Sequence, residues 1–133
     1  MRDATASPVI KSKMVGRRGK DLEREAKKFL KERFRTELVF KLINTERMDF
    51  IVIDSGGTVN LVEAKQTKTN FYNPKAKPKN RAQLEHYFSV ISELRTLVDQ
   101  QFASFWMLIR LRGKLVFKKY ENIGEIPTRI EAE

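Results

Sequence analysis

The sequence predicts a single α/β domain in which helices flank a mixed central sheet, with the element order α-β-β-β-α-β-β. Two stretches with helical spacing of apolar residues are separated by a group of short strand-like runs, and two more such runs follow the second stretch. A length of 133 residues is suited to one hydrophobic core. Hydrophobic residues make up 41% of the chain, which is typical of a globular protein.

The chain is expected to begin with a flexible basic arm at 1–15, followed by one domain over 16–133. The arm mixes proline, serine and basic residues without periodicity. A helix is predicted over 17–34, because its apolar residues recur at helical spacing. That apolar face consists of Leu22, Ala26, Phe29, Leu30 and Phe34.

Three strand-like runs follow at 36–43, 48–54 and 58–65. The Ser-Gly-Gly sequence at 55–57 predicts a hairpin between the last two runs. The runs are short and nearly continuous in apolar residues, which is typical of a sheet covered on both faces.

The second half of the chain predicts a loop, a helix and a strand pair. Residues 66–80 form a polar, basic loop, and a loop of this length in a compact domain is often functional. A helix is predicted over 81–101, and strands are predicted at 103–111 and 114–120 around an Arg-Gly turn. The large apolar residues expected in the core or in a dimer interface are Phe105, Trp106 and Met107.

Charge and composition narrow the function. The formal net charge of +10 indicates an anionic partner, with nucleic acid favoured over an anionic membrane surface. No apolar run is long enough to cross a membrane, and the first residues lack the apolar stretch of a signal peptide, so a cytoplasmic protein is expected. The chain has no cysteine, and His86, expected on the polar side of its helix, is the only histidine. Any bound metal would therefore depend on carboxylates and carbonyl oxygens, which suit Mg²⁺ or Mn²⁺.

Two acidic residues in apolar strands are the strongest functional signal. Glu63 and Lys65 are two apart in a predicted strand, so their side chains project to one face and Ala64 turns to the other. Pairing across the hairpin can place Asp49 beside Glu63, so two carboxylates and an ammonium would meet at a sheet edge. Such a set can hold a metal ion for phosphodiester hydrolysis, and the Ala64 carbonyl is a plausible extra ligand. The alternatives are a solvated Glu-x-Lys face and an Asp49 that only caps a turn.

These residues resemble a known family. Gly-Lys-Asp-Leu-Glu-Arg-Glu at 19–25 resembles the Gly-x-x-x-Glu-Arg-Glu helix start of archaeal Holliday-junction resolvases. Asp49, followed by Glu-Ala-Lys at 63–65, resembles the Asp…Glu-x-Lys motif of that family and of the PD-(D/E)XK nuclease superfamily. Gln83 stands where many of these nucleases have a glutamine. The similarity extends over 16–120.

The resemblance implies a restriction-endonuclease-like fold and a Mg²⁺-dependent DNA endonuclease, with Mn²⁺ able to substitute. It implies that Asp49 and Glu63 bind the metal and that Glu23 is a further ligand, directly or through water. Lys65 would be catalytic, and Gln83 would support the site or contact DNA. A symmetric homodimer acting on branched DNA is also implied.

Two positions qualify this resemblance. Methionine, rather than proline, precedes Asp49. Glu25 competes with Glu23 as the helix carboxylate. We favour Glu23 from its spacing to Gly19, and expect Glu25 to be a solvated i,i+4 partner of neighbouring lysines.

Basic residues gather in two places where DNA could bind. The first cluster consists of Arg17, Arg18 and Lys20. The second consists of Lys68, Lys75, Lys77, Lys79 and Arg81. Phe71 and Tyr72 lie within the second cluster, and they could stack on unpaired bases or pack the loop onto the domain.

The leading hypothesis is a structure-selective DNA endonuclease that resolves Holliday junctions in DNA recombination and repair. One alternative keeps the nuclease but gives it flaps, single strands or duplex DNA as substrate. An alternative from another class is a DNA-binding module without catalysis. An RNA substrate is less favoured, because splicing-type relatives need a histidine-centred site.

Overall fold

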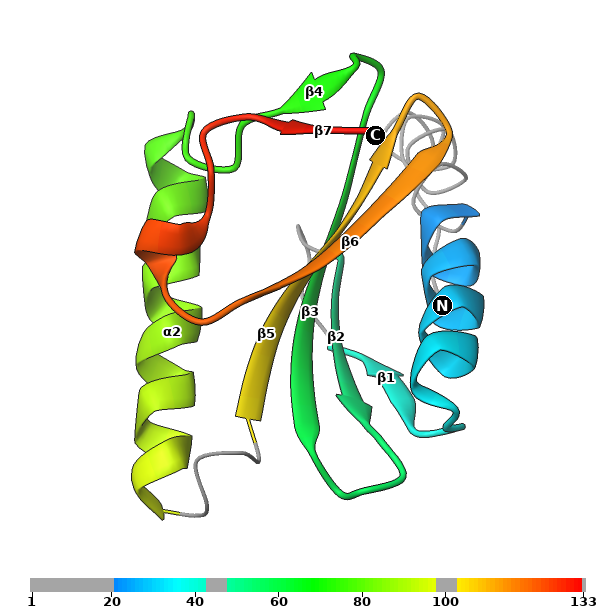
Figure 1. Ribbon diagram of the computed structural model, residues 1–133, viewed down its shortest axis with the longest axis vertical. Helices are drawn as coiled ribbons and strands as arrows, with labels where there is room; N and C mark the ends of the chain where they lie inside the picture. The colour runs from blue at the N-terminus through cyan, green and yellow to red at the C-terminus, as the bar shows by residue number, and fades with distance from the viewer. Residues whose placement is uncertain (1–20, 43–47, 98–102, 133) are drawn as a thin grey trace, which may run out of the picture.

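The computed structural model describes residues 21–42, 48–97 and 103–132. The predicted arm, Arg17, Arg18 and Lys20 lie outside the described residues. The described chain has a mixed α/β architecture, as predicted, with a mostly antiparallel central sheet and two helices (Figure 1). The first helix is described over 21–34. The other elements are β1 (Val39–Lys41), β2 (Met48–Ile53), β3 (Val59–Thr67), β4 (Phe71–Tyr72), α2 (Pro78–Leu97), β5 (Ala103–Leu111), β6 (Lys114–Tyr120), the 3₁₀ helix η2 (Ile123–Glu125) and β7 (Ile130–Glu131).

The central sheet has the strand order β1-β2-β3-β5-β6, so β3 is its middle strand. Only β3 and β5 pair in parallel, and the other neighbouring pairs are antiparallel. Parallel neighbours need a crossover connection, which here contains β4 and α2. The short strands β4 and β7 form a separate two-stranded sheet.

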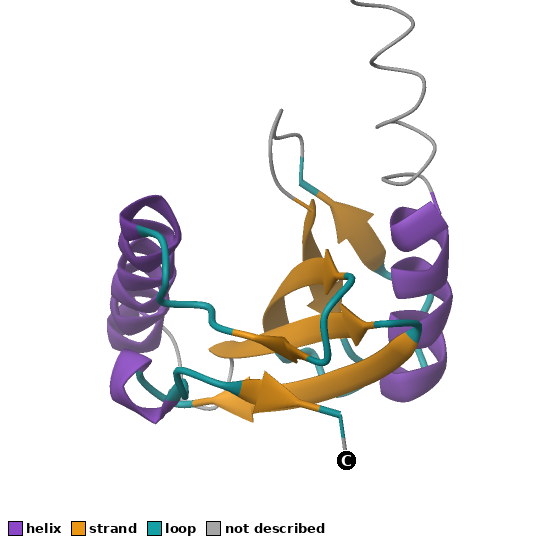
Figure 2. Cartoon of the chain, turned by 90° about the horizontal axis from the view of Figure 1, so that it is seen from above, coloured by secondary structure: helices purple, strands orange, loops and turns teal. Residues whose placement is uncertain are grey.

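The two helices cover opposite faces of the sheet (Figure 2). Side chains alternate between the faces along a strand, so Val62 and Ala64 of β3 pack on the side of the first helix. Leu61 of β3 packs on the side of α2. Most of β5 is buried, because it is an inner strand with helices on both sides. Phe105 and Met107 are in the core, as expected, and Trp106 packs beside it.

The hairpin between β2 and β3 is confirmed. Oδ1 of Asp54 accepts hydrogen bonds from the backbone N–H groups of Gly56 at 2.9 Å and Thr58 at 3.0 Å. Gly57 has φ +84°, a left-handed conformation that glycine adopts without strain. This turn fixes the register of the two strands that carry the acidic residues.

The predicted strand at 36–43 is longer than the observed β1. Thr36 precedes the strand, and its hydroxyl donates to the carbonyl oxygen of Ile53 at 2.8 Å. Residues 36–42 of the predicted strand are described, and only 39–41 of them form β1. Thr36 therefore joins the ends of β1 and β2 through its side chain, and the ladder itself begins at Val39.

The predicted loop at 66–80 was wrong at both ends. Strand β3 continues to Thr67, and α2 begins at Pro78, three residues before the predicted helix. Proline is favoured in the first turn of a helix, because its missing N–H would have no partner there. The middle of the segment forms β4, which pairs with β7 near the C-terminus. Among the described residues, no helix is long and apolar enough to cross a membrane.

Candidate functional site

Asp49 and Glu63 lie directly opposite each other on β2 and β3. Each residue is only 2% exposed to solvent. Directly opposed residues of an antiparallel pair have Cβ atoms about 4.5–5.5 Å apart, so the two carboxylates are close enough to share one cation. The predicted meeting of these residues is confirmed. The predicted position at a sheet edge was wrong, because β3 is the middle strand.

Helix α2 covers this pair through Tyr87. The Tyr87 hydroxyl donates a hydrogen bond to Oδ2 of Asp49. Burial raises the pKa of Tyr87 far above its ordinary value, and the hydrogen bond to Asp49 and the charge of Glu63 raise it further. The hydroxyl therefore stays protonated and can hold the Asp49 carboxylate in one orientation.

Gln83 belongs to the same group, one helical turn before Tyr87. A contact of its side chain with the Tyr87 hydroxyl lowers the pKa of Tyr87, against the effect of burial. Residues four apart on a helix are neighbours on its surface, which explains why Gln83 and Tyr87 meet. The structure thus connects the predicted Gln83 to Asp49 through a tyrosine.

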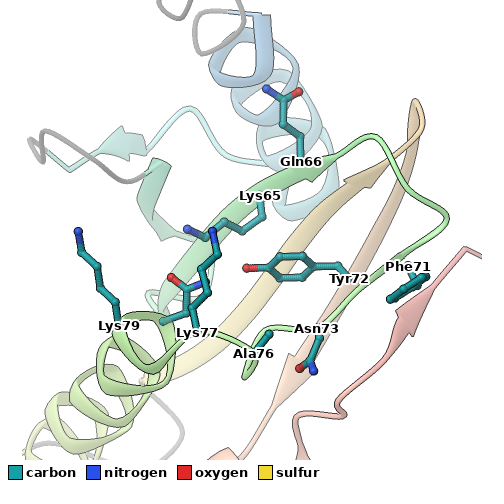
Figure 3. Close-up of a pocket in the computed structure, with 9 residues that line it drawn as sticks. Lys65, Gln66, Phe71, Tyr72, Asn73, Ala76, Lys77 and Lys79 are labelled. Atoms are coloured by element: carbon teal, nitrogen blue, oxygen red, sulfur yellow. The ribbon is translucent and has the colours of Figure 1, made fainter.

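Lys65 follows Glu63 on the same face of β3, because residues two apart in a strand point the same way. It is half-buried and lines a pocket of about 580 Å³ beside β4 and the start of α2 (Figure 3). Ala64 turns to the opposite face, as predicted, and is buried against the first helix. The role of the Ala64 carbonyl as a metal ligand stays a prediction.

The Glu23 carboxylate pairs with two lysines and is not part of the group formed by Asp49 and Glu63. Its carboxylate is 3.0 Å from Nζ of Lys27 and 3.5 Å from Nζ of Lys41. The hydrogen bond from Lys27 lowers the pKa of Glu23, the charge of Lys41 lowers it further, and burial acts in the opposite direction. Among the described residues, no three acidic or histidine side chains are grouped to hold a metal ion, so the structure does not bring Glu23 to Asp49 and Glu63.

Glu25 is not the lysine partner that was expected. Its Oε1 atom is 2.5 Å from Nη1 of Arg110 on β5. The i,i+4 partner of a lysine on this helix is instead Glu23. Each of the two candidate helix carboxylates therefore holds a neighbouring element: Glu23 contacts β1 through Lys41, and Glu25 contacts β5.

The second basic cluster is spread over the segment from the end of β3 to the start of α2. Lys77 and Lys79 line the same pocket as Lys65, and Lys68 lies in a neighbouring pocket with Arg110. Two further members, Lys75 and Arg81, are half-buried and exposed, respectively.

The two aromatic residues of this segment differ in their surroundings. Tyr72 packs partly against the core and also lines the pocket. Phe71 has the guanidinium of Arg129 4.0 Å from its ring centroid. His86 is exposed, as expected.

The residue that sequence reasoning missed is Tyr87. Its spacing with Leu84 and Ile91 is that of a helix core, and these neighbours are indeed buried in the core. The available signal was its position four residues after Gln83, on the helix predicted to follow the Glu-x-Lys sequence. Spacing alone does not separate a core tyrosine from one whose hydroxyl contacts a carboxylate.

The donor set fits a hard divalent cation. Oδ1 of Asp49 and Oε1 of Glu63 are buried carboxylate oxygens on directly opposed residues. Two buried carboxylates at this separation repel each other unless a cation or a proton compensates them. Mg²⁺ is commonly held by one or two carboxylates and completes its coordination with water and substrate phosphate.

Comparisons with protein-family models, with curated proteins and with solved structures find no match to this chain.

Proposed function

We propose that this chain is a Mg²⁺-dependent DNA endonuclease with a restriction-endonuclease-like fold, acting on branched DNA. The observation that carries the proposal is the buried, directly opposed pair Asp49 and Glu63, with Lys65 two residues further along the same strand. The chain order of the central sheet also supports it, because a helix precedes β1, β2 and β3 of this sheet, and α2 precedes β5 and β6.

Each residue has a defined role in hydrolysis. Asp49 and Glu63 would hold the ion, and Tyr87 would keep Asp49 oriented through its hydrogen bond. When bound, Mg²⁺ supplies polarisation of the phosphate and a more acidic water. Lys65 would orient the attacking water and offset the negative charge that develops on the phosphate. Gln83 would position Tyr87.

Glu23 enters this proposal only as an indirect contributor. Its contacts with Lys27 and Lys41 compete with a role as a direct ligand. A water between Glu23 and the ion is compatible with its predicted role, and replacement by glutamine would then reduce cutting less than replacement of Asp49 does.

The proposed partners are branched DNA and a second copy of the chain. A net charge of +10 favours binding to the DNA backbone, and Lys77 and Lys79 line the pocket that contains Lys65. Paired cuts in a four-way junction need two active sites, which a symmetric homodimer provides. The second candidate keeps the same chemistry on flaps, single strands or duplex DNA. Among these substrates, the pocket next to Lys65 favours those with unpaired nucleotides.

The test is cleavage of a DNA panel in Mg²⁺. The purified protein is incubated with a four-way junction, a flap, a single strand and a duplex of related sequence. Symmetric nicks near the crossover are expected for junction resolution, and cutting confined to another structure supports the second candidate. Binding without cutting in Mg²⁺ or Mn²⁺ would favour a DNA-binding module.

Matched variants separate the site from general effects. Asp49→Asn and Glu63→Gln should abolish cutting and leave most DNA binding intact, because the phosphate contacts come from the lysines. Glu32→Gln removes an equal charge from an exposed position on the first helix and should cut like the wild type. Equal cutting by all three variants contradicts the proposed site.

A further inference from the structure

A pocket on the face of the sheet that α2 covers contains Lys65, which follows Glu63 on the same face of β3. The pocket is walled by the end of β3, by β4 and by the turn into α2 (Figure 3). Lys65 belongs both to this wall and to the Glu-x-Lys sequence, so the pocket continues the proposed active site along β3. Its volume of about 580 Å³ is within the usual range of ligand-binding clefts.

The lining of the pocket favours an anionic ligand. Three of its residues are the lysines Lys65, Lys77 and Lys79. All nine lining residues belong to the described part of the chain, and none of the nine is acidic. Lysine ammonium groups are common phosphate ligands.

The pocket also contains an aromatic ring. Tyr72 extends into it, with the hydroxyl end directed toward Lys65 and Lys77 (Figure 3). Pairing of Tyr72 with Ile130 across β4 and β7 fixes the backbone that carries this ring. Phe71 also lines the pocket, but the guanidinium of Arg129 lies over its ring. A fixed ring among lysines is the arrangement by which proteins stack a base and hold its phosphate.

We propose that this pocket binds one unpaired nucleotide of the DNA strand being cut, with its base on Tyr72 and its phosphate at Lys77 and Lys79. The neighbouring phosphate would then lie at Lys65, beside Asp49 and Glu63. A base within a continuous duplex is stacked on both faces and paired at its edge, so it cannot enter such a pocket without being flipped out. The inference rests on the proposed nuclease function and narrows its substrate to DNA with unpaired nucleotides.

The test measures binding without divalent metal, so that it does not depend on cutting. A fluorescent single strand and the duplex of the same sequence are titrated with wild-type protein in EDTA. Tyr72→Leu keeps apolar bulk but removes the stacking ring, and it should weaken single-strand binding about tenfold. Its effect on duplex binding should be less than about twofold. Tyr72→Phe should bind the single strand like the wild type. So should the control Phe40→Leu, which changes an exposed ring on β1 that does not line the pocket.

A charge variant and a modified DNA add independent readouts. Lys77→Gln should lower the salt dependence of single-strand binding by roughly 0.7 in the slope of log K against log salt, which corresponds to one phosphate contact. Abasic substitution at each position in turn should weaken wild-type binding about tenfold at one position, and this measurement needs no variant protein.

Two results would overturn the inference. The first is an equal loss for Tyr72→Leu and Phe40→Leu, or an equal loss of Tyr72→Leu on single strand and duplex. The second is an abasic scan without a sensitive position. Neither result bears on cutting in Mg²⁺ by the wild type, so the failure of the pocket and the failure of the nuclease proposal are distinguishable.

Discussion

The Tyr87 hydroxyl donates a hydrogen bond to Oδ2 of Asp49, and so joins α2 to the strand that carries one of the two buried carboxylates. This contact spans 38 positions of the sequence. Because Tyr87 also contacts Gln83, a substitution at either helix residue should change the orientation of the Asp49 carboxylate.

Tyr87→Phe should lower the free energy of unfolding by about 1.5–3 kcal/mol, because a buried carboxylate loses a hydrogen-bond donor. Urea denaturation in EDTA measures this change. Tyr120→Phe is the control, since Tyr120 is buried in the same core cluster. A cost at Tyr120 as large as that at Tyr87 would contradict the importance of the contact with Asp49.

Mg²⁺ should stabilise the wild-type protein, because the opposed carboxylates of Asp49 and Glu63 form its proposed site in the folded state only. At a concentration 100 times its Kd, the gain in unfolding free energy should be about 2.7 kcal/mol. Thermal unfolding with and without Mg²⁺ measures the effect. Asp49→Asn and Glu63→Gln should lose the response, and the exposed Glu32→Gln should keep it. A response that survives in all three variants would place the ion elsewhere.

Stability should fall in acid partly through Glu23. Its pKa in the folded protein is below the ordinary value of 4.5, so its contribution is present above that value and is lost as the pH falls through the folded-state pKa. Glu23→Gln should therefore lose less stability than the wild type between neutral pH and about pH 3. Denaturant unfolding across this range measures the difference. Glu32→Gln should follow the wild type, and identical curves for Glu23→Gln and the wild type would refute the prediction.

Gly57→Ala should cost about 1–2 kcal/mol of stability, because alanine is strained at φ +84° even though the space around it is open. Gly56→Ala is a matched control at the adjacent turn position. An added Cβ at Gly56 would lie 3.5 Å from Oδ1 of Asp54, an ordinary contact, so the cost should be small. Urea denaturation of both variants decides the matter, and equal costs would show that backbone conformation is not the cause.

The local features of the fold were predictable, and so was the central pair of the site. The glycine turn and the alternation of strand side chains were enough to predict that Asp49 faces Glu63 and that Ala64 points the other way. Both are consequences of short-range geometry. Helix α2 was also predictable, because its apolar residues have helical spacing. The predicted start at residue 81 is three residues later than the observed start at Pro78.

Features that depend on tertiary packing were not predictable. The pairing of β4 with β7 joins two-residue strands far apart in the chain, and strands this short have no periodicity to detect. The partners of Glu23 and Glu25 depend on how the first helix lies on the sheet, which brings Lys41 and Arg110 within reach. The role of Tyr87 depends on how α2 lies on the other face.

The position of Glu63 on the middle strand has a consequence for how the molecule opens. Its amide lies on a strand flanked by β2 and β5, whereas Tyr72 lies on a two-residue strand paired only with β7. Amide hydrogen exchange is slowest in the inner strands of a core and fastest in short peripheral ones. Mild denaturant should therefore open β4, which carries Tyr72, first. Asp49 and Glu63 should remain paired until global unfolding.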